Sequence, residues 1–400
     1  HEFIDRVFME VSLDGDCAVR RICEALGEKF PDPIRVADAE IDLAITESDP
    51  SMLADLEFAA ERIRRFHEQT LPDDWADPNM EVGQLFRPID SVGIYAPGGR
   101  AAYPSSLLMT AIPAKVAGVD KLVVLSPGDE TGQIPTATLA AARIAGADAI
   151  YAVGGAQAIA AMSMGTESIP RVDKIAGPGN IFVVLAMRRA FGLTGVSTLP
   201  GPTETLLIAD KTANPREVAA DLIAQAEHDT LAAPILLTDS PTLATEVETE
   251  LNIQISDLPR KDIVAAALKG RGGIGVVDSL DEAVTLANQY APEHLCLLTT
   301  DPRELLKKVR NAGGVFMGTH SPEVLGDYVA GPSHVMPVGG TARYASPVTV
   351  NDFMKTISIF DLSQELSLKL TPLAARLARY EGLEGHARAA EIRIPKDHQH

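Results

Sequence analysis

The sequence predicts an α/β protein in which parallel β-sheets are covered by helices on both faces. From Val92 onward, short apolar and β-branched runs alternate with Ala-rich segments of helical character. Strands that are apolar throughout and separated by helices are typical of parallel sheets buried on both faces. The chain has 400 residues, of which 46% are hydrophobic and 22% charged, and a chain of this length can form two domain-sized cores.

The expected elements alternate in a regular order. A charged helix is expected at 50–70, with His67 on its charged face and without a functional role, and the Pro-rich stretch 71–78 ends it. The expected strands are Lys121–Ser126, Ala149–Val153, Thr205–Ala209, Pro234–Thr238, Ile274–Val277 and Gly314–Met317. The expected helices are Ser105–Ala117, Thr136–Ala145, Pro215–His228 and the helical tail Gln364–Ile394. Gly- and Pro-containing segments at 198–202 and 346–347 indicate crossings between domains.

Charge and composition exclude several classes of function. The net charge of −20 would repel nucleic acids and anionic lipids, because binding either one depends on clustered Lys and Arg. No apolar run reaches the roughly 20 residues that a transmembrane helix needs. Three cysteines, Cys17, Cys23 and Cys296, are too few and too irregularly spaced for a disulfide framework or a Cys-based zinc site. We therefore expect a cytoplasmic protein that binds neither nucleic acid nor membranes.

Gly270, Gly272 and Gly275 have the G-x-G-x-x-G spacing of a dinucleotide-binding fingerprint. In that fingerprint the glycines follow a strand and open a helix, so that the pyrophosphate meets the helix N-terminus. Here they follow a helical stretch and lead into an expected strand, so we interpret them as a helix-to-strand loop. Other glycine clusters precede helical segments, where they could either bind phosphate or form tight turns. These clusters are residues 96–99, 154–155 and 177–180.

Two candidate metal ligands lie three residues apart near the end of one expected helix. Asn214 can cap this helix, and Pro215 suits its first turn. Gln225 and His228 should project together from the margin of its apolar stripe. Residues of this kind are more often a hydrogen-bonded buried pair than metal ligands, and Gln is an uncommon zinc ligand. The spacing alone leaves both interpretations open.

Acid and base side chains occur next to each other at further positions. Glu293 and His294 precede an apolar run, where a carboxylate and an imidazole can divide proton transfers between them. A surface loop that happens to contain an acid and a base is the alternative. Asp327 and His334 form a similar pair on a Gly-Pro-rich loop. In the tail, the two glycines of 381–386 interrupt a helix, which costs about 1 kcal/mol each unless the bends serve a purpose.

Several of these stretches resemble, in this order, those of one family, the histidinol dehydrogenases. The resemblance extends from about Gly83 to Arg393. It is carried by Gly93–Gly99 (GIYAPGG), Gly154–Ala160 (GGAQAIA), Gly177–Asn180 (GPGN), Gln225–His228 (QAEH), Ala291–Leu295 (APEHL), Gly326–Tyr328 (GDY) and Glu381–Ala387 (EGLEGHA). So many matches in the same order are hard to obtain by chance.

This resemblance implies a set of ligands and roles. It implies zinc held by Gln225, His228, Asp327 and His386, where His386 comes from the other subunit of a domain-swapped homodimer. Glu293 and His294 would be the catalytic acid–base residues. The implied substrate contacts are Thr203, Asp327, His334, Glu381 and His386, and the implied NAD contacts are Tyr95, Gln157 and Asn180.

The resemblance also implies a fold of two incomplete Rossmann-like domains with parallel sheets, plus a helical C-terminal tail that crosses to the partner. Residues 1–91 would then be an N-terminal helical region and the first part of domain 1, and residues 92–202 a Rossmann-like domain 2. Residues 203–348 would be the second part of domain 1, and residues 349–400 the crossing tail.

Three positions differ from the commoner family pattern. Thr203 stands where Ser is usual, Ser333 where Asn is usual, and Cys296 where a longer polar side chain is frequent. Thr203 keeps a hydroxyl group, so we expect its function to be retained.

The implied function is the zinc-dependent, NAD-linked oxidation of L-histidinol through L-histidinal to L-histidine, the last steps of histidine biosynthesis. Manganese or cobalt could occupy the same ligands. One alternative is a related zinc and NAD dehydrogenase of another polyol, such as a sulfonated diol. His334 and Glu381 argue against it, because a cationic amine needs a carboxylate partner whereas a sulfonate needs Arg or Lys. The other alternative, a catalytically inactive zinc-binding or scaffold protein, is disfavoured because Glu293 and His294 are both present.

Overall fold

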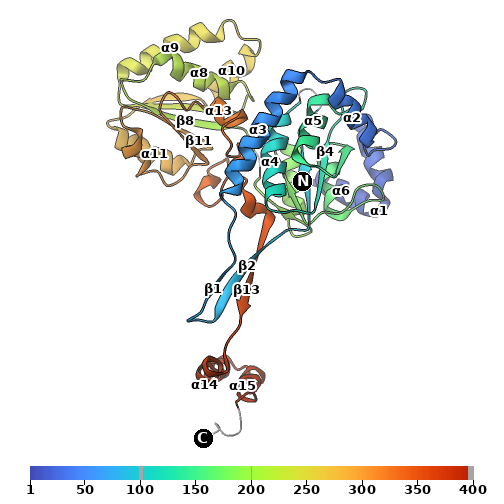
Figure 1. Ribbon diagram of the computed structural model, residues 1–400. Helices are drawn as coiled ribbons and strands as arrows, with labels where there is room; N and C mark the ends of the chain where they lie inside the picture. The colour runs from blue at the N-terminus through green and yellow to red at the C-terminus, as the bar shows by residue number, and fades with distance from the viewer. Residues whose placement is uncertain (99–101, 200, 395–400) are drawn as a thin grey trace. The chain divides into compact units, whose positions relative to one another are not determined.

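The computed structural model describes residues 1–98, 102–199 and 201–394. Gly99 of the expected GIYAPGG stretch and residues 395–400 of the expected tail lie outside this description. The chain forms two compact units, which are His1–Leu71 with Pro88–Phe353, and Pro72–Arg87 with Met354–His400. The first unit contains two parallel sheets with helices on both faces (Figure 1). This arrangement confirms the expected α/β class.

The first parallel sheet has the strand order β5-β4-β3-β6-β7. Its strands are β3 (Ser91–Tyr95), β4 (Lys121–Ser126), β5 (Ala149–Ala152), β6 (Lys174–Ala176) and β7 (Gly195–Val196). The chain builds outward from β3 to β5 and then returns to the other side of β3, where Val92 pairs with Lys174 of β6. The strands β3 and β6 therefore flank the switch point of the sheet, beside which parallel α/β sheets bind ligands at their carboxyl ends.

Two layers of helices cover this sheet. On one face, α2 (Asp38–Thr46) and α3 (Pro50–Glu68) pack with α4 (Pro104–Val116) and α5 (Thr136–Ala145). On the other face, α1 (Glu2–Ala25) packs with α6 (Gly155–Met164) and α7 (Ile181–Ala190). The helix α1, which bends at Gly15 (φ +51), contributes Phe8 and Val19 to the core. The resemblance implies a helical region at 1–91 but gives no bounds for this helix.

The second parallel sheet repeats this topology, with the strand order β10-β9-β8-β11-β12. Its strands are β8 (Glu204–Ala209), β9 (Ala233–Thr238), β10 (Gly273–Val276), β11 (His294–Leu298) and β12 (Gly314–Met317). Leu207 and Ala209 of β8 face the core with α8 (Pro215–Ala226), α9 (Pro241–Ile255) and α10 (Lys261–Gly270). Leu206 and Ile208 face α11 (Leu280–Tyr290) and α12 (Pro302–Leu306). Because both faces are buried, the strand is apolar throughout.

The glycines that match the dinucleotide fingerprint lie where the interpretation as a loop requires. Gly270 is the last residue of α10, and Gly273 is the first residue of β10. The segment thus leaves a helix and enters a strand, which confirms that it is not a phosphate-binding turn of the Rossmann type.

His67 differs from expectation. It does not lie on the charged face of α3 but is fully buried, at 0% exposure, and neither of its ring nitrogens has a hydrogen-bond partner. The helix packs against both α4 and α5, so a wider part of its surface is covered than its charged sequence suggests.

The second unit contains a small sheet and a pair of helices. The sheet has the order β1-β2-β13, with β1 (Trp75–Asp77) antiparallel to β2 (Val82–Pro88) and β13 (Met354–Phe360) at the other edge. The helices α14 (Gln364–Tyr380) and α15 (Glu384–Glu391) pack together. Gly382, with φ +76, lies between them, so one of the two tail glycines allows the chain to turn from one helix to the next. The helical C-terminal tail is thereby confirmed.

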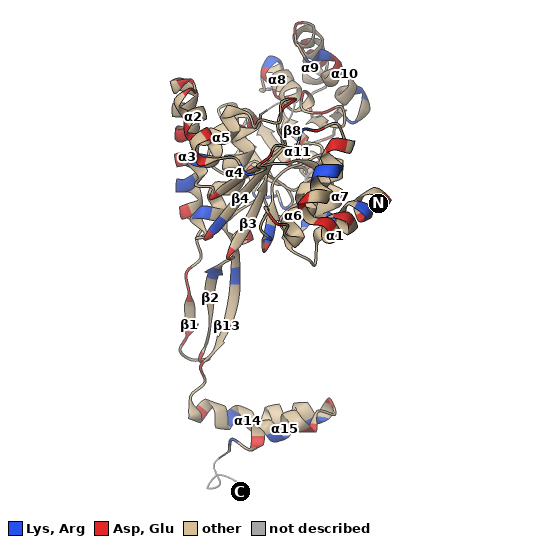
Figure 2. Cartoon of the chain, turned by 90° about the vertical axis from the view of Figure 1, so that its right-hand side faces the viewer, with Lys and Arg blue, Asp and Glu red and all other residues tan. Residues whose placement is uncertain are grey.

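Charged side chains lie mainly on helices and turns, whereas strands such as β3 and β4 are uncharged over most of their length (Figure 2). No helix in the described part of the chain is both long enough and apolar enough to cross a membrane. The domain division at residues 92, 203 and 349 stays a prediction. The remaining short elements are α13 (Glu323–Tyr328) and the 3-10 helices η1 (Thr341–Arg343) and η2 (Val350–Phe353).

Candidate active site

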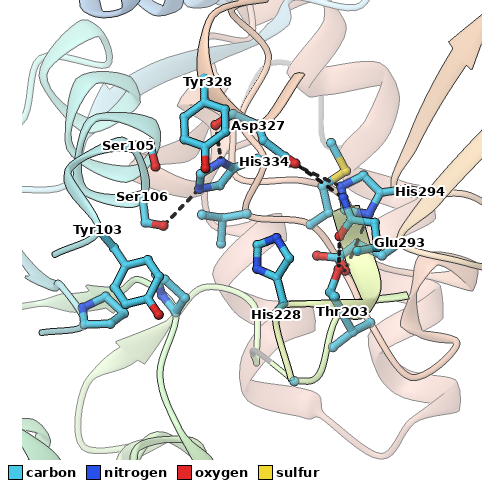
Figure 3. Close-up of a pocket in the computed structure, with 17 residues that line it drawn as sticks. Tyr103, Ser105, Ser106, Thr203, His228, Glu293, His294, Asp327, Tyr328 and His334 are labelled. Carbon is cyan, nitrogen blue, oxygen red and sulfur yellow. Dashed lines mark hydrogen bonds and ion pairs between the residues drawn. The ribbon is translucent and has the colours of Figure 1, made fainter. Parts of the chain in front are cut away.

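A pocket of about 240 Å³ in the first unit collects most of the expected site residues (Figure 3). Pro97 and Pro178 reach it from the carboxyl ends of β3 and β6 in the first sheet, and Tyr103, Ser105 and Ser106 reach it from the start of α4. The expected residues that line it are Thr203, Gln225, His228, Glu293, His294, Asp327 and His334.

The turn between α11 and β11 places Glu293 and His294. The helix ends at Tyr290, and its C-cap Ala291 adopts the left-handed conformation (φ +58) although it is not a glycine. Non-glycine residues are uncommon in this conformation, and such positions concentrate at functional sites. Three residues later β11 begins at His294, which pairs in register with Thr205 of β8. Thr203 directly precedes β8, so the parallel pairing brings these side chains together at the amino ends of both strands.

Glu293 is buried, at 8% exposure, and is held by two donors. Its Oε2 accepts hydrogen bonds from the backbone N–H of Glu204 at 3.0 Å and from the Thr203 hydroxyl group at 2.7 Å. Burial raises the pKa of Glu293 to about 7. A carboxyl group of this kind can exchange a proton near neutral pH.

The backbone of Glu204, which binds Glu293, also orients His294. Its Nδ1 lies 3.1 Å from the carbonyl oxygen of Glu204, which can only accept, so Nδ1 carries a hydrogen. Its Nε2 is buried without a hydrogen-bond partner and lies 3.7 Å from Oδ1 of Asp327. Burial alone would lower the pKa of His294, but the carboxyl groups of Glu293, Asp327 and Glu323 outweigh it and raise the pKa to about 10.

Three candidate zinc ligands border the same pocket. Gln225 is buried at the end of α8, and its Nε2 lies 3.3 Å from Oδ2 of Asp327. Its Oε1 accepts from the hydroxyl group of Thr203 at 2.9 Å. His228 projects into the pocket from the turn after α8 (Figure 3). Among the described residues, no group of three His, Cys, Asp or Glu side chains could hold a metal ion. Of the expected zinc ligands in this unit, only His228 and Asp327 are residues of these types, and the third, Gln225, is an amide.

His334 joins the two halves of the pocket. Its Nδ1–H donates to the carbonyl oxygen of Asp327 at 2.6 Å, which leaves Nε2 to accept from the Ser106 hydroxyl group at 3.0 Å. The neighbouring Ser333 donates to the carbonyl oxygen of Met109 at 2.9 Å. Ser106 and Ser333 therefore both fix this loop to α4. Ser106 is not among the site residues expected from the sequence. Its place in the first turn of a helix that follows a glycine-rich loop is the only signal in the sequence.

The three expected NAD residues do not line this pocket. The buried Tyr95 accepts a hydrogen bond from the N–H of Gly155 at 3.1 Å. Gln157 is also buried, and its Nε2 donates to Glu28 at 3.0 Å. Asn180 caps α7 by accepting from the N–H groups of the next turn. All three follow or end strands of the first sheet at its carboxyl edge, and their role in binding NAD stays a prediction.

Glu381 and His386 belong to the second unit. Glu381 is the C-cap of α14, His386 lies in α15, and both side chains are exposed. Their roles in binding substrate and zinc stay predictions.

Comparison with known proteins agrees with this geometry. The sequence profile of the histidinol dehydrogenase family matches residues 1–394, a wider range than the resemblance from 83 to 393. Histidinol dehydrogenase of Deinococcus radiodurans is 50% identical over 401 residues, covering 98% of this chain and 90% of that protein. That of Halalkalibacterium halodurans is 45% identical over 394 residues, covering 98% and 93%. The crystal structure of histidinol dehydrogenase from Elizabethkingia anophelis has a TM-score of 0.95 at 35% identity, covering 98% of this chain and 91% of that one. The chain therefore belongs to the histidinol dehydrogenase family of oxidoreductase enzymes.

Proposed function

We propose that this enzyme oxidises L-histidinol through L-histidinal to L-histidine, the last steps of histidine biosynthesis, with zinc and two molecules of NAD. The observation that carries the proposal is the pair Glu293 and His294, which sit side by side in one pocket with different partners. His294 presents Nε2 without a hydrogen-bond partner, and Glu293 is held by Thr203 and by the backbone of Glu204. Two proton-transfer groups in fixed positions suit a reaction with two oxidation steps.

Oxidation of the alcohol would pass hydride from its carbon to bound NAD, and Nε2 of His294 would take the hydroxyl proton. The ring must be neutral for this, and the positive charge of zinc held beside Asp327 would offset the carboxyl groups that raise the pKa of His294. In the second step water adds to the aldehyde carbon, and Glu293 takes a proton from this water. The resulting hydrate anion would give hydride to a second bound NAD and become the carboxylic acid. Hydration is required because hydride leaves from a tetrahedral carbon. Each turnover therefore consumes one water and reduces two NAD.

The residues of the pocket fit a zinc ion. The Gln225 amide touches the Asp327 carboxylate, and a flip of this amide would present its oxygen to the same space that His228 borders. Nitrogen and oxygen donors of these types suit zinc. Zinc bound there would supply a Lewis acid that orients the amine and hydroxyl groups of the substrate and adds positive charge beside His294.

The geometry of the first sheet supports NAD binding. Pro97 and Pro178 follow β3 and β6, so they stand on the two sides of the switch point and also line the pocket. Gly177 has φ +121, and a side chain there would collide with the carbonyl oxygen of Tyr95. The backbone is thus closely packed at the place where a parallel α/β sheet binds a nucleotide.

The charge of the pocket favours an amino alcohol over a sulfonated diol. The described residues that line it include Glu293 and Asp327 but neither Lys nor Arg. A cationic substrate would find carboxylates there, whereas a sulfonate would meet repulsion.

We further propose a homodimer in which the C-terminal tails cross. The second unit exposes large apolar side chains, including Leu377 at 62% and Tyr380 at 84%. A cluster of exposed apolar side chains next to Glu381 and His386 supports burial against another chain. The free thiols of all three cysteines support the expected cytoplasmic setting.

Removal of zinc tests the proposal. We expect chelation to lower NADH formation from histidinol by about 100-fold or more, the scale of losing a main electrostatic contribution, and added zinc to restore it. The thermal unfolding temperature should change much less, because a chain of this length has cores of its own. Full activity of metal-free protein would contradict the proposal, as would a purified protein that oxidises a sulfonated diol but not histidinol.

A further inference from the structure

Beneath the pocket lies a second layer of polar side chains. Residues two apart on a strand, or four apart on a helix, lie on the same face of the element. Three pocket residues have a buried polar neighbour at this spacing, namely Thr205 for Thr203, Cys296 for His294 and Glu323 for Asp327. Polar groups of this kind are costly to bury unless they bond to each other.

Glu323 is the centre of this layer. Its side chain is 1% exposed. Its Oε1 accepts hydrogen bonds from the hydroxyl group of Thr205 on β8 and from the thiol group of Cys296 on β11, the latter at 2.8 Å. Its Oε2 is buried without a partner. One carboxyl group therefore ties the start of α13 to two neighbouring strands of the second sheet.

The helix α13 buries little apolar surface. Its other anchors lie towards its C-terminal end, where His334 donates to the carbonyl oxygen of Asp327 and Arg62 donates to the carbonyl oxygens of Val329 and Ala330. Only Glu323 and Gly326 of its six residues are buried, and Val324, Leu325 and Tyr328 are between 44% and 53% exposed. At Gly326 the backbone lies against the ring of Phe316, where a side chain would collide. Apolar burial therefore contributes little to the position of this helix, although the helix carries Asp327.

We propose that Glu323 is a positioning residue, whose carboxyl group anchors α13 and thereby holds Asp327 against Gln225 and His294. The inference rests on the proposed zinc-dependent function, because Asp327 is an expected zinc ligand. Groups behind the ligands of a metal orient those ligands, and their removal commonly lowers metal affinity or activity by about 10- to 100-fold.

The test compares Glu323→Ala with Glu323→Gln and with a matched control. We expect Glu323→Ala to raise the zinc dissociation constant, measured by competition with a chromophoric chelator, by about 10- to 100-fold. Glu323→Gln should recover most of this affinity, because its amide oxygen can still accept from Thr205 and Cys296. Chelator competition reports the position of Asp327 without requiring turnover.

Asp210→Ala is the control. Asp210 is also a buried carboxylate, directly after the carboxyl end of β8, and it accepts hydrogen bonds from Thr212 and Thr300. Its loss should lower the thermal unfolding temperature while leaving zinc affinity at the wild-type value. A purely structural role for Glu323 predicts instead that zinc affinity follows the unfolding temperature in the same way in both variants.

Several outcomes would overturn the inference. Wild-type zinc affinity in folded Glu323→Ala would do so, as would equal losses in Glu323→Ala and Glu323→Gln. If Glu323→Ala does not fold, Thr205→Val is measured instead, because it removes one of the two donors to Glu323. Wild-type zinc affinity in Thr205→Val would also overturn the inference. A wild-type protein that binds no zinc at all would defeat the proposed function and this inference with it, whereas a zinc-binding wild type with an unaffected Glu323→Ala would defeat the inference alone.

Discussion

Thr203 illustrates how one hydroxyl group can serve two neighbours in the pocket. Its Oγ1 lies 2.7 Å from Glu293 Oε2 and 2.9 Å from Gln225 Oε1. A hydroxyl group has a single proton and so donates to one of them at a time. The direction of this bond is therefore coupled to whether Glu293 carries a proton. A Ser side chain could make the same contacts, which supports the expectation that Thr203 retains the function.

The proposed division of roles between Glu293 and His294 can be tested by Glu293→Gln. The amide keeps the shape of the side chain but cannot take a proton from water. We expect oxidation of the aldehyde to slow by about 10²- to 10⁴-fold, the usual contribution of a general base, and oxidation of the alcohol to slow much less. The two half-reactions are measured separately, with histidinol and with histidinal as substrates. An equal loss in both would show that the assignment of roles is wrong.

At the level of single residues, the sequence predicts most of the pocket residues but not the side chains that hold them in position. Glu293 and His294 are adjacent in a recognisable stretch, and the structure brings them together with Asp327 and His334. Ser106 escapes prediction because 228 residues separate it from His334. Such a contact is created by the packing of α4 against a distant loop, and no local pattern encodes it.

Among the elements, those with strong periodicity are predicted best. The expected strand at 121–126 and helix at 136–145 match β4 and α5 at both ends. The small sheet of β1, β2 and β13 has no such signal, because β13 is mostly exposed and its neighbour β2 lies far away in the sequence. The helix α1 also lacks a continuous pattern, since Gly15 bends it and shifts the apolar stripe.

The helix α3 gives a prediction about pH and stability. Burial lowers the pKa of His67 to about 4 from its ordinary value of 6.5, so the folded protein favours the neutral ring. Above pH 6.5 His67 is neutral in both the folded and the unfolded protein and does not reduce stability. As the pH falls from 6.5 towards 4, the ring is protonated only in the unfolded protein, so the free energy of unfolding falls. We expect wild-type protein to lose on the order of 2 kcal/mol more unfolding free energy over this interval than His67→Leu, since one pKa unit is about 1.4 kcal/mol.

Urea unfolding at a series of pH values between 7.5 and 4.5 measures this difference. The other titrating groups are the same in both proteins, so their contributions cancel in the comparison. Parallel curves for the two proteins would mean that His67 does not titrate differently in the folded and unfolded states.

On the scale of the whole first unit, two sheets with the same strand order are used in opposite ways. The pocket lies at the carboxyl edge of the first sheet and at the amino edge of the second. The carboxyl edge of the second sheet is filled by Asp210, whose oxygens accept from the N–H groups of Thr212 and Thr300. Backbone N–H groups at this edge are what a phosphate group would need. This difference between the two edges supports the proposed assignment of NAD to the first sheet.

The proposed crossing of the tails would be a property of a whole dimer, and mixing two inactive mutants tests it. Suppose that a Glu293→Gln subunit pairs with a His386→Ala subunit. If each tail completes the partner's pocket, one pocket of the mixed dimer collects both substitutions and the other collects neither. If each tail serves its own pocket, every pocket carries one substitution. Only crossed tails can therefore restore an intact site.

The expected activity of the mixture follows from counting pockets. When equal amounts of the two mutants are unfolded and refolded together, about half of the dimers are mixed and each has one intact pocket of two, which gives about a quarter of wild-type activity. Histidinol-dependent NADH formation measures it, and different affinity tags on the two mutants show that mixed dimers are present. Samples refolded separately and then combined are the control, because their subunits have not exchanged. Mixed dimers with no more activity than this control would mean that His386 serves the pocket of its own chain.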